Sequence, residues 1–211
     1  RDITERKRRE RQMRRNIINF DLEEGRAYTV REKGPVSALN VMEDLLRAGY
    51  DGHALTRLPV DSVGNELPDG MEHLWLSDVS STGTLLPSKE HILGWLRELG
   101  RRRAVYIDGL DYMCSRMGSG DLVRLVQSIR ETAHTRGHTV ILLVDPDTLD
   151  AGTLALVEKG APGLAPKFAS RLPDTLMEML AFVYERNSAG RDPSHTEVGQ
   201  EMGISPPTTR K

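Results

Sequence analysis

Four aspartates stand at or just after the ends of predicted strands, which is where a parallel α/β sheet binds its ligands. They are Asp78, Asp108, Asp111 and Asp145. Clustered carboxylate oxygens are the ligands of hard cations such as Mg²⁺, so a cation site is one prediction. The alternative is that these side chains cap the helices or loops that follow. For Asp145, which stands directly before Pro146, we predict the second role, as the N-cap of a helix.

The strand that ends in Asp108 carries the most specific of these signals. The run Val105–Asp108 is apolar up to its final aspartate and resembles the Walker B element of NTPases, whose carboxylate holds Mg²⁺. Asp108 and Asp111 are therefore the candidate cofactor-binding residues, interpreted as the vestige of such a site.

The other parts of an NTPase site are absent from the sequence. A phosphate-binding loop would follow the first strand, but residues 32–37 contain no Gly-Lys-Ser/Thr, and Pro35 removes a backbone donor there. Hydrolases of the RecA type place a glutamate after the second strand, where this chain has Thr56 and Arg57. We therefore predict no catalytic residues, no cofactor and no enzymatic activity.

Composition places the protein among soluble intracellular chains. The net charge is −2, but residues 1–15 sum to +5, so the remaining 196 residues sum to −7. The longest apolar run, 140–144, is too short to span a bilayer. The single Cys114 suits a reducing compartment, and no histidine has metal-ligand spacing with it. These features predict a cytoplasmic protein with no metal and no membrane segment.

The elements that must position the aspartates alternate between strands and helices over residues 23–160. Apolar patterning predicts strands at 27–31, 53–56, 73–77, 104–108 and 139–144, and helices at 35–46, 87–99 and 121–134. Such alternation predicts an α/β fold with a five-stranded, mainly parallel sheet flanked by helices. The continuous apolar run 139–144 is typical of a central strand covered on both faces.

The N-terminal part, residues 1–22, has the pattern of a charged helix with a narrow apolar stripe of Met13, Ile17 and Phe20. Such a helix buries little by itself, so it pairs with a copy of itself or packs on the core; we predict a homodimer through it. Residues 1–7 resemble the segment that closes PAS sensory domains. The resemblance implies a preceding PAS domain and a helix that relays its state.

The C-terminal part, residues 161–211, begins with a Gly/Pro-rich hinge and continues with the signature of a partial winged helix-turn-helix. Gly203 makes the turn, and Ser205 caps the second helix. The residues predicted to meet the major groove of DNA are Ser205, Thr208, Thr209 and Arg210. The chain stops inside this motif, so we interpret it as a piece of a longer protein, and the complete protein as DNA-binding.

Five ordered blocks between residues 23 and 160 carry a further resemblance. They are 25–30, 49–57, 74–77, 106–113 and 144–149. Together they look like an archaeal domain-of-unknown-function family, number 835 in its series, which resembles degenerate KaiC/RecA-like ATPases. The resemblance implies a degenerate P-loop-like fold and a regulatory role, and supplies no catalytic residues.

These features predict a non-catalytic signal-relay module that links PAS input to a DNA-binding tail. The first alternative is a nucleotide-binding switch or ATPase that uses Asp108. The second is a scaffold that binds another protein through exposed Trp75 or Trp95, although both tryptophans are better explained as core residues.

Overall fold

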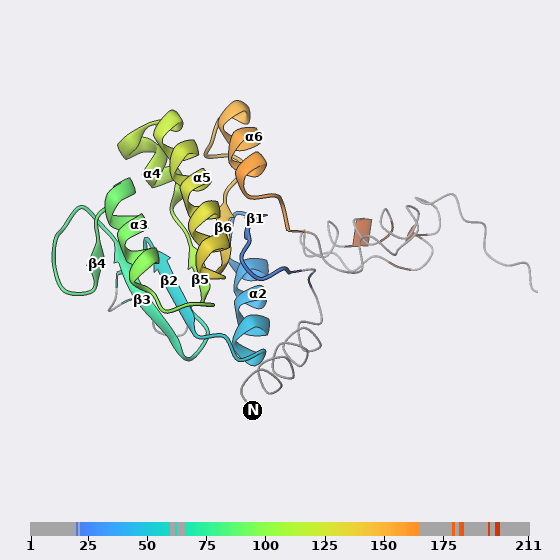
Figure 1. The fold of residues 1–211 in the computed structure, drawn as a ribbon. Coiled ribbons are helices and arrows are strands. Elements are labelled where there is room, and N and C mark those ends of the chain that lie inside the picture. Colours follow the sequence, from blue (N-terminus) through green and yellow to red (C-terminus); the bar gives the residue numbers. More distant parts are fainter. Residues whose placement is uncertain are drawn as a thin grey trace, which may run out of the picture. The chain divides into compact units, whose positions relative to one another are not determined.

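Six strands form a single parallel sheet in the order β1-β6-β5-β2-β3-β4 (Figure 1). The strands are β1 (Ala27–Arg31), β2 (Gly52–Thr56), β3 (Met71–Leu76), β4 (Thr84–Leu85), β5 (Ala104–Ile107) and β6 (Thr139–Val144). The five predicted strands are all present, but the predicted number was wrong, because β4 adds a sixth. A strand of two residues is too short to show the alternation from which strands are predicted.

The computed structural model describes residues 20, 22–59, 62 and 66–164, together with 179, 182–183, 194 and 197–198. The chain divides into two units, residues 1–165 and 166–211. The predicted N-terminal helix lies outside the described residues, except at its end, where Phe20 and Leu22 are described.

Five helices flank the sheet. They are α2 (Val36–Arg47), α3 (Lys89–Glu98), α4 (Leu110–Met117), α5 (Ser119–Arg136) and α6 (Ala151–Gly160). Three of them were expected at nearly these bounds. The additional α4 occupies the connection after β5, where Leu110 and Met113 point inward over only two turns.

β6 occupies a central position, between β1 and β5, as its apolar sequence predicted. All six of its residues are buried, from Thr139 to Val144. A strand covered on both faces needs apolar side chains in both directions, which explains the absence of alternation.

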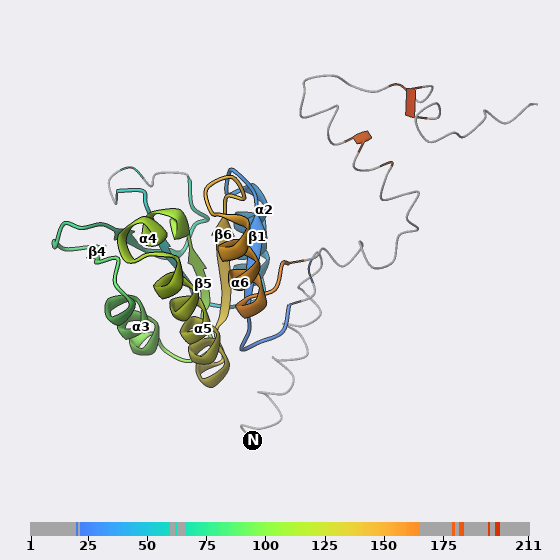
Figure 2. The same ribbon diagram turned by 90° about the horizontal axis from the view of Figure 1, so that it is seen from above.

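The helices divide unequally between the two faces of the sheet. One apolar cluster joins the sheet to α3, α4, α5 and α6. A second cluster lies on the opposite face, where Val41, Met42 and Leu45 of α2 pack against Tyr106 and Ile141. Figure 2 shows α2 on the side of the sheet away from the other four helices. We call this second cluster the α2-side cluster.

The last helix begins later than predicted. The expected N-cap, Asp145, instead closes a turn, in which its Oδ1 accepts the backbone N–H of Asp147 at 3.0 Å. The N-cap of α6 is Asp150, whose Oδ1 accepts the backbone N–H of Thr153 at 2.9 Å. Asp145 therefore has a capping role, as predicted, but it caps a turn and not the helix.

The segments that lead into and out of the domain both attach at β1. Before β1, the backbone N–H of Glu23 donates to the Tyr28 hydroxyl at 2.8 Å. After α6, Thr29 forms an isolated parallel bridge with Gly163. The N–H of Thr29 donates to the Pro162 carbonyl at 3.0 Å, and the N–H of Leu164 donates to the Thr29 carbonyl at 2.8 Å. We call residues 22–26 the incoming segment and residues 162–164 the outgoing segment.

In the C-terminal unit, Ser194 and Glu197 form the reciprocal hydrogen bonds of a capping box. The N–H of Ser194 donates to Glu197 Oε2 at 2.8 Å, and the N–H of Glu197 donates to Ser194 Oγ at 3.3 Å. This arrangement is that of a helix N-terminus.

Among the described residues, no helix combines the length and the apolar character that crossing a bilayer requires.

Candidate functional site

A pocket of about 200 Å³ opens at the carboxyl ends of β1, β6 and β5. This is the edge at which parallel sheets hold ligands. The charged residues that line it are Glu32, Lys33, Asp108, Asp111 and Asp145. The pocket therefore unites three of the four predicted aspartates with two residues that sequence reasoning had passed over.

Asp108 lies where β5 ends and is held in place by backbone contacts. Its N–H donates to the Leu55 carbonyl of β2 at 2.9 Å, and its Oδ1 accepts the N–H of Gly109 at 2.5 Å. Burial raises the pKa of the Asp108 carboxyl, and the charge of Asp111 raises it further. The Gly109 N–H and the Arg57 guanidinium act in the opposite direction. Asp108 is thus a partly desolvated carboxyl with a neighbouring acid.

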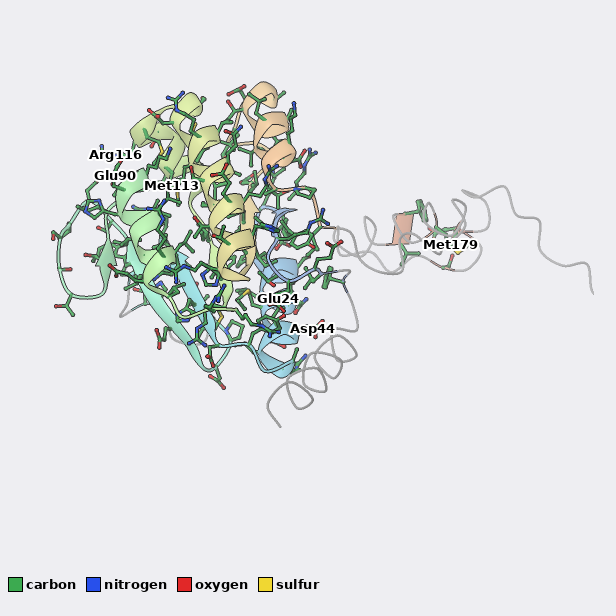
Figure 3. The ribbon with its side chains drawn as sticks, in the orientation of Figure 1. Glu24, Asp44, Glu90, Met113, Arg116 and Met179 are labelled. Atoms are coloured by element: carbon green, nitrogen blue, oxygen red, sulfur yellow. The ribbon has the colours of Figure 1, made fainter. Side chains whose placement is uncertain are left out.

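Asp78 lies outside this pocket. It follows β3, which β2 separates from β5 in the sheet. Its carboxylate accepts the Tyr112 hydroxyl at 2.7 Å and pairs with Arg116 at 3.0 Å. Arg116 is labelled on α4 in Figure 3. The prediction of a four-carboxylate cluster was therefore wrong for Asp78.

Arg57 connects the region of Asp78 to Asp108. Its guanidinium donates to the Leu76 carbonyl and stacks on the Tyr112 ring at 3.7 Å from the centroid. An arginine thus stands after β2, where a RecA-type hydrolase would need a glutamate. Its contacts join the end of β2 to the end of β3 and to α4.

Glu32 occupies the N-terminus of α2. Its Oε2 accepts the backbone N–H of Ser37 at 2.9 Å, and its Oε1 accepts that of Ala38 at 2.8 Å. The first helical N–H groups after a β-strand are the donors that bind phosphate in nucleotide-binding loops. Here a carboxylate of the chain itself satisfies two of them, and Pro35, the N-cap, provides no side-chain cap.

Sequence reasoning missed Glu32 because helix caps are sought at the N-cap itself, not three or more residues before it. The available signal was an acidic residue shortly before a helix whose N-cap is a proline.

Among the described residues that line the pocket, Lys33 carries the only positive charge. Its Nζ pairs with Asp147 Oδ2 at 2.6 Å, on the surface, and this contact raises the pKa of the ammonium group. The lining consequently has four acidic side chains against one paired lysine, an electrostatic environment that repels polyphosphate.

The arrangement also lacks the geometry of a metal site. Among the described residues, no three His, Cys, Asp or Glu side chains lie where they could jointly hold a metal ion. The predicted vestigial site thus keeps its aspartates, while the donors that would bind a phosphate are filled by Glu32.

The two tryptophans are half-buried. Trp95 packs against the apolar cluster on the α3–α6 face. The predicted DNA-binding residues Ser205, Thr208, Thr209 and Arg210 lie outside the described residues.

The chain is similar to one protein family and to a solved structure. No curated protein matches the chain. A solved structure from Pyrococcus horikoshii OT3, described as a structural study of Project ID PH0250, is similar with a TM-score of 0.48 and 12% identity. The match covers 69% of this chain and 87% of that one.

A family model described as "Protein of unknown function (DUF835)" matches residues 32–160, from the Glu32 loop to the end of α6. Since the match spans more than half of the sequence, the chain belongs to the DUF835 family.

Proposed function

We propose that this chain is a non-catalytic signal-relay module, in which the α/β domain couples the incoming segment to the outgoing segment. The observation that supports this proposal is that Leu22 and Leu164 both pack against the α2-side cluster. Tyr28 and Val30 of β1 belong to that cluster, and Thr29 between them bonds to the outgoing segment. A displacement of the incoming segment therefore acts on the strand that holds the outgoing one.

In the complete protein, the input would come from a PAS domain before residue 1 and the output would be DNA binding by the C-terminal part. The PAS-like motif at residues 1–7 and the helix-turn-helix signature support these two roles. Coupling requires that the input favour one arrangement of β1 over another, because a signal that acts equally on both shifts nothing.

In this proposal a nucleotide is not the signal, because Glu32 occupies the helix N–H groups that would bind a phosphate and the pocket lining is acidic. Calorimetric titration of MgATP and MgADP into the chain tests this point, with Asp108→Asn as the control. We expect no binding up to millimolar nucleotide. Saturable binding that Asp108→Asn abolishes would replace the relay with a nucleotide-controlled switch.

A double-mutant cycle tests the coupling itself. We expect the effects of Leu22→Ala and Leu164→Ala on the free energy of unfolding to deviate from additivity by at least about 0.5 kcal/mol. The control pair is Leu22→Ala with Leu85→Ala, because Leu85 is a half-buried leucine on the opposite face of the sheet. That pair should be additive. Additivity in both pairs would contradict the relay.

A further inference from the structure

A groove distinct from the acidic pocket lies along α2. It encloses about 450 Å³ between the helix and the chain at residues 66–69. Its lining residues are Val36, Leu39, Asn40, Glu43, Glu66, Leu67, Pro68 and Asp69.

The helix side of the groove is a continuous stripe, because Val36, Leu39, Asn40 and Glu43 follow the i, i+3, i+4, i+7 spacing of one helix face. Val36 is 69% exposed, the largest exposure among the exposed large apolar side chains of the described residues. A helix face that presents exposed apolar side chains beside polar ones is suited to receiving a second amphipathic helix.

The charges of the groove have one sign. Glu43, Glu66 and Asp69 line it, and none of the described residues of its lining is a lysine or arginine. Arg47 pairs with Glu43 at 2.6 Å from the next turn of α2, which leaves Glu66 and Asp69 to attract a cation. The groove therefore fits a partner that is both apolar and basic.

Residues 1–19 of the same chain have this composition. They carry eight Arg/Lys and three acidic side chains, a balance of +5. In a helix, Arg6, Arg9, Met13 and Ile17 would share one face at i, i+3, i+7 and i+11, with basic groups at one end and apolar groups at the other.

The attachment of this segment favours the same face of the domain. Phe20, directly after it, packs against the α2-side cluster, as do the groove residues Leu39 and Leu67. Phe20, the described residue to which residues 1–19 are joined, thus lies on the face of the sheet where the groove lies.

We propose that the groove between α2 and residues 66–69 binds residues 1–19 of its own chain, with Met13 and Ile17 on Val36 and Leu39, and the arginines beside Glu66 and Asp69. The interpretation of this docked state as the resting position of the input segment rests on the proposed relay. The docking itself is measured independently of the relay.

The test places a nitroxide spin label at residue 12 in the full chain, using Gln12→Cys in a Cys114→Ser background. Gln12 adjoins the stripe without belonging to it. At low salt, we expect the label to broaden the backbone amide signals of Asn40 and Asp69. Glu66→Lys with Asp69→Lys should abolish this broadening. Glu98→Lys with Glu131→Lys, an equal charge change at exposed positions of α3 and α5, should leave it intact.

Three results would overturn the proposal. One is the absence of broadening in the labelled chain, and another is broadening that survives the double reversal at residues 66 and 69. The third is broadening of the Asn40 and Asp69 signals of an unlabelled chain when it is mixed with the spin-labelled one. That result would show that the groove binds residues 1–19 of a second copy. Since Leu22 and Leu164 lie outside the groove, their coupling can persist when docking fails, so the two failures are distinguishable.

Discussion

The carboxylate of Glu32 lies at the N-terminus of α2, where its Oε1 accepts the backbone N–H of Ala38 at 2.8 Å. With the bond from Ser37, this carboxylate replaces both a conventional N-cap and the phosphate that such a helix would receive in a nucleotide-binding protein. The stability of the first turn of α2 should therefore depend on this one side chain.

Glu32→Ala should lower the free energy of unfolding by about 0.5–2 kcal/mol, the usual cost of losing a helix cap. Urea unfolding measures this. The matched control is Glu43→Ala on the same helix, whose surface ion pair with Arg47 contributes at most about 0.5 kcal/mol. Equal effects of the two substitutions would show that Glu32 does not cap α2.

Asp108→Asn should change how stability depends on pH. Because burial raises the pKa of Asp108 above its ordinary 3.8, the folded state favours the protonated carboxyl. The contribution of this group is greatest below pH 3.8 and is lost as pH rises through the folded-state pKa. The variant should therefore gain stability relative to the native chain between pH 4 and pH 7, measured by urea unfolding across that range. Asp121→Asn, at an exposed carboxylate paired with Arg124, is the control. A constant difference across the range would contradict the prediction.

His138 should contribute to a loss of stability in mild acid. The side chain is fully buried, with Nδ1 accepting the N–H of Arg103 and Nε2 donating to the Leu96 carbonyl, each at 3.1 Å. Burial lowers its pKa, so the folded state binds fewer protons than the unfolded chain, and stability falls as pH drops below about 6.5. His53 and His73 have pKa values lowered by burial and act in the same direction.

His138→Gln should cost about 1–3 kcal/mol at pH 7.5, because buried bonds are lost, and should flatten the dependence between pH 7 and pH 5.5. Thermal unfolding at several pH values gives both quantities. His134→Gln, at an exposed position of α5, should leave the slope unchanged. If the stability of the His138 variant depends on pH as steeply as that of the native chain, other groups cause the loss of stability in mild acid.

Gly109→Ala should be more harmful than its backbone conformation alone explains. Gly109 has φ +89°, and an added Cβ would lie 2.8 Å from Arg57 Cγ. Gly70 has a similar φ of +86°, with nothing within 4 Å of an added Cβ. Both substitutions incur strain of about 1–3 kcal/mol, and Gly109→Ala should lose at least about 1 kcal/mol more, measured by urea unfolding. Equal losses of stability in the two variants would mean that the Arg57 side chain moves aside at no cost in free energy.

The sequence predicted those parts of the fold that depend on long, uniform patterns. The continuous apolar run 139–144 identified β6 as a central strand, and the spacing of Leu122, Leu125 and Ile129 identified α5. By contrast, β4 and α4 are too short for a period to be visible, and their positions depend on the neighbouring strand and on Gly109.

Only those parts of the candidate site that lie at the ends of strands could be predicted from the sequence. Asp108 and Asp145 meet because β5 and β6 are neighbours, whereas Asp78 is separated by the position of β3, which no local pattern specifies. The role of Glu32 depends on how residues 33–35 turn back toward α2, a three-dimensional relationship that the order of residue types does not reveal.

The bridge between Thr29 and Gly163 also bears on how the protein avoids aggregation. A bare edge strand offers a row of unpaired backbone groups to another molecule. On β1, the outgoing segment takes up part of that row, and at the opposite edge β4 presents only two residues. Release of residues 162–164 would therefore expose a template for intermolecular strand pairing.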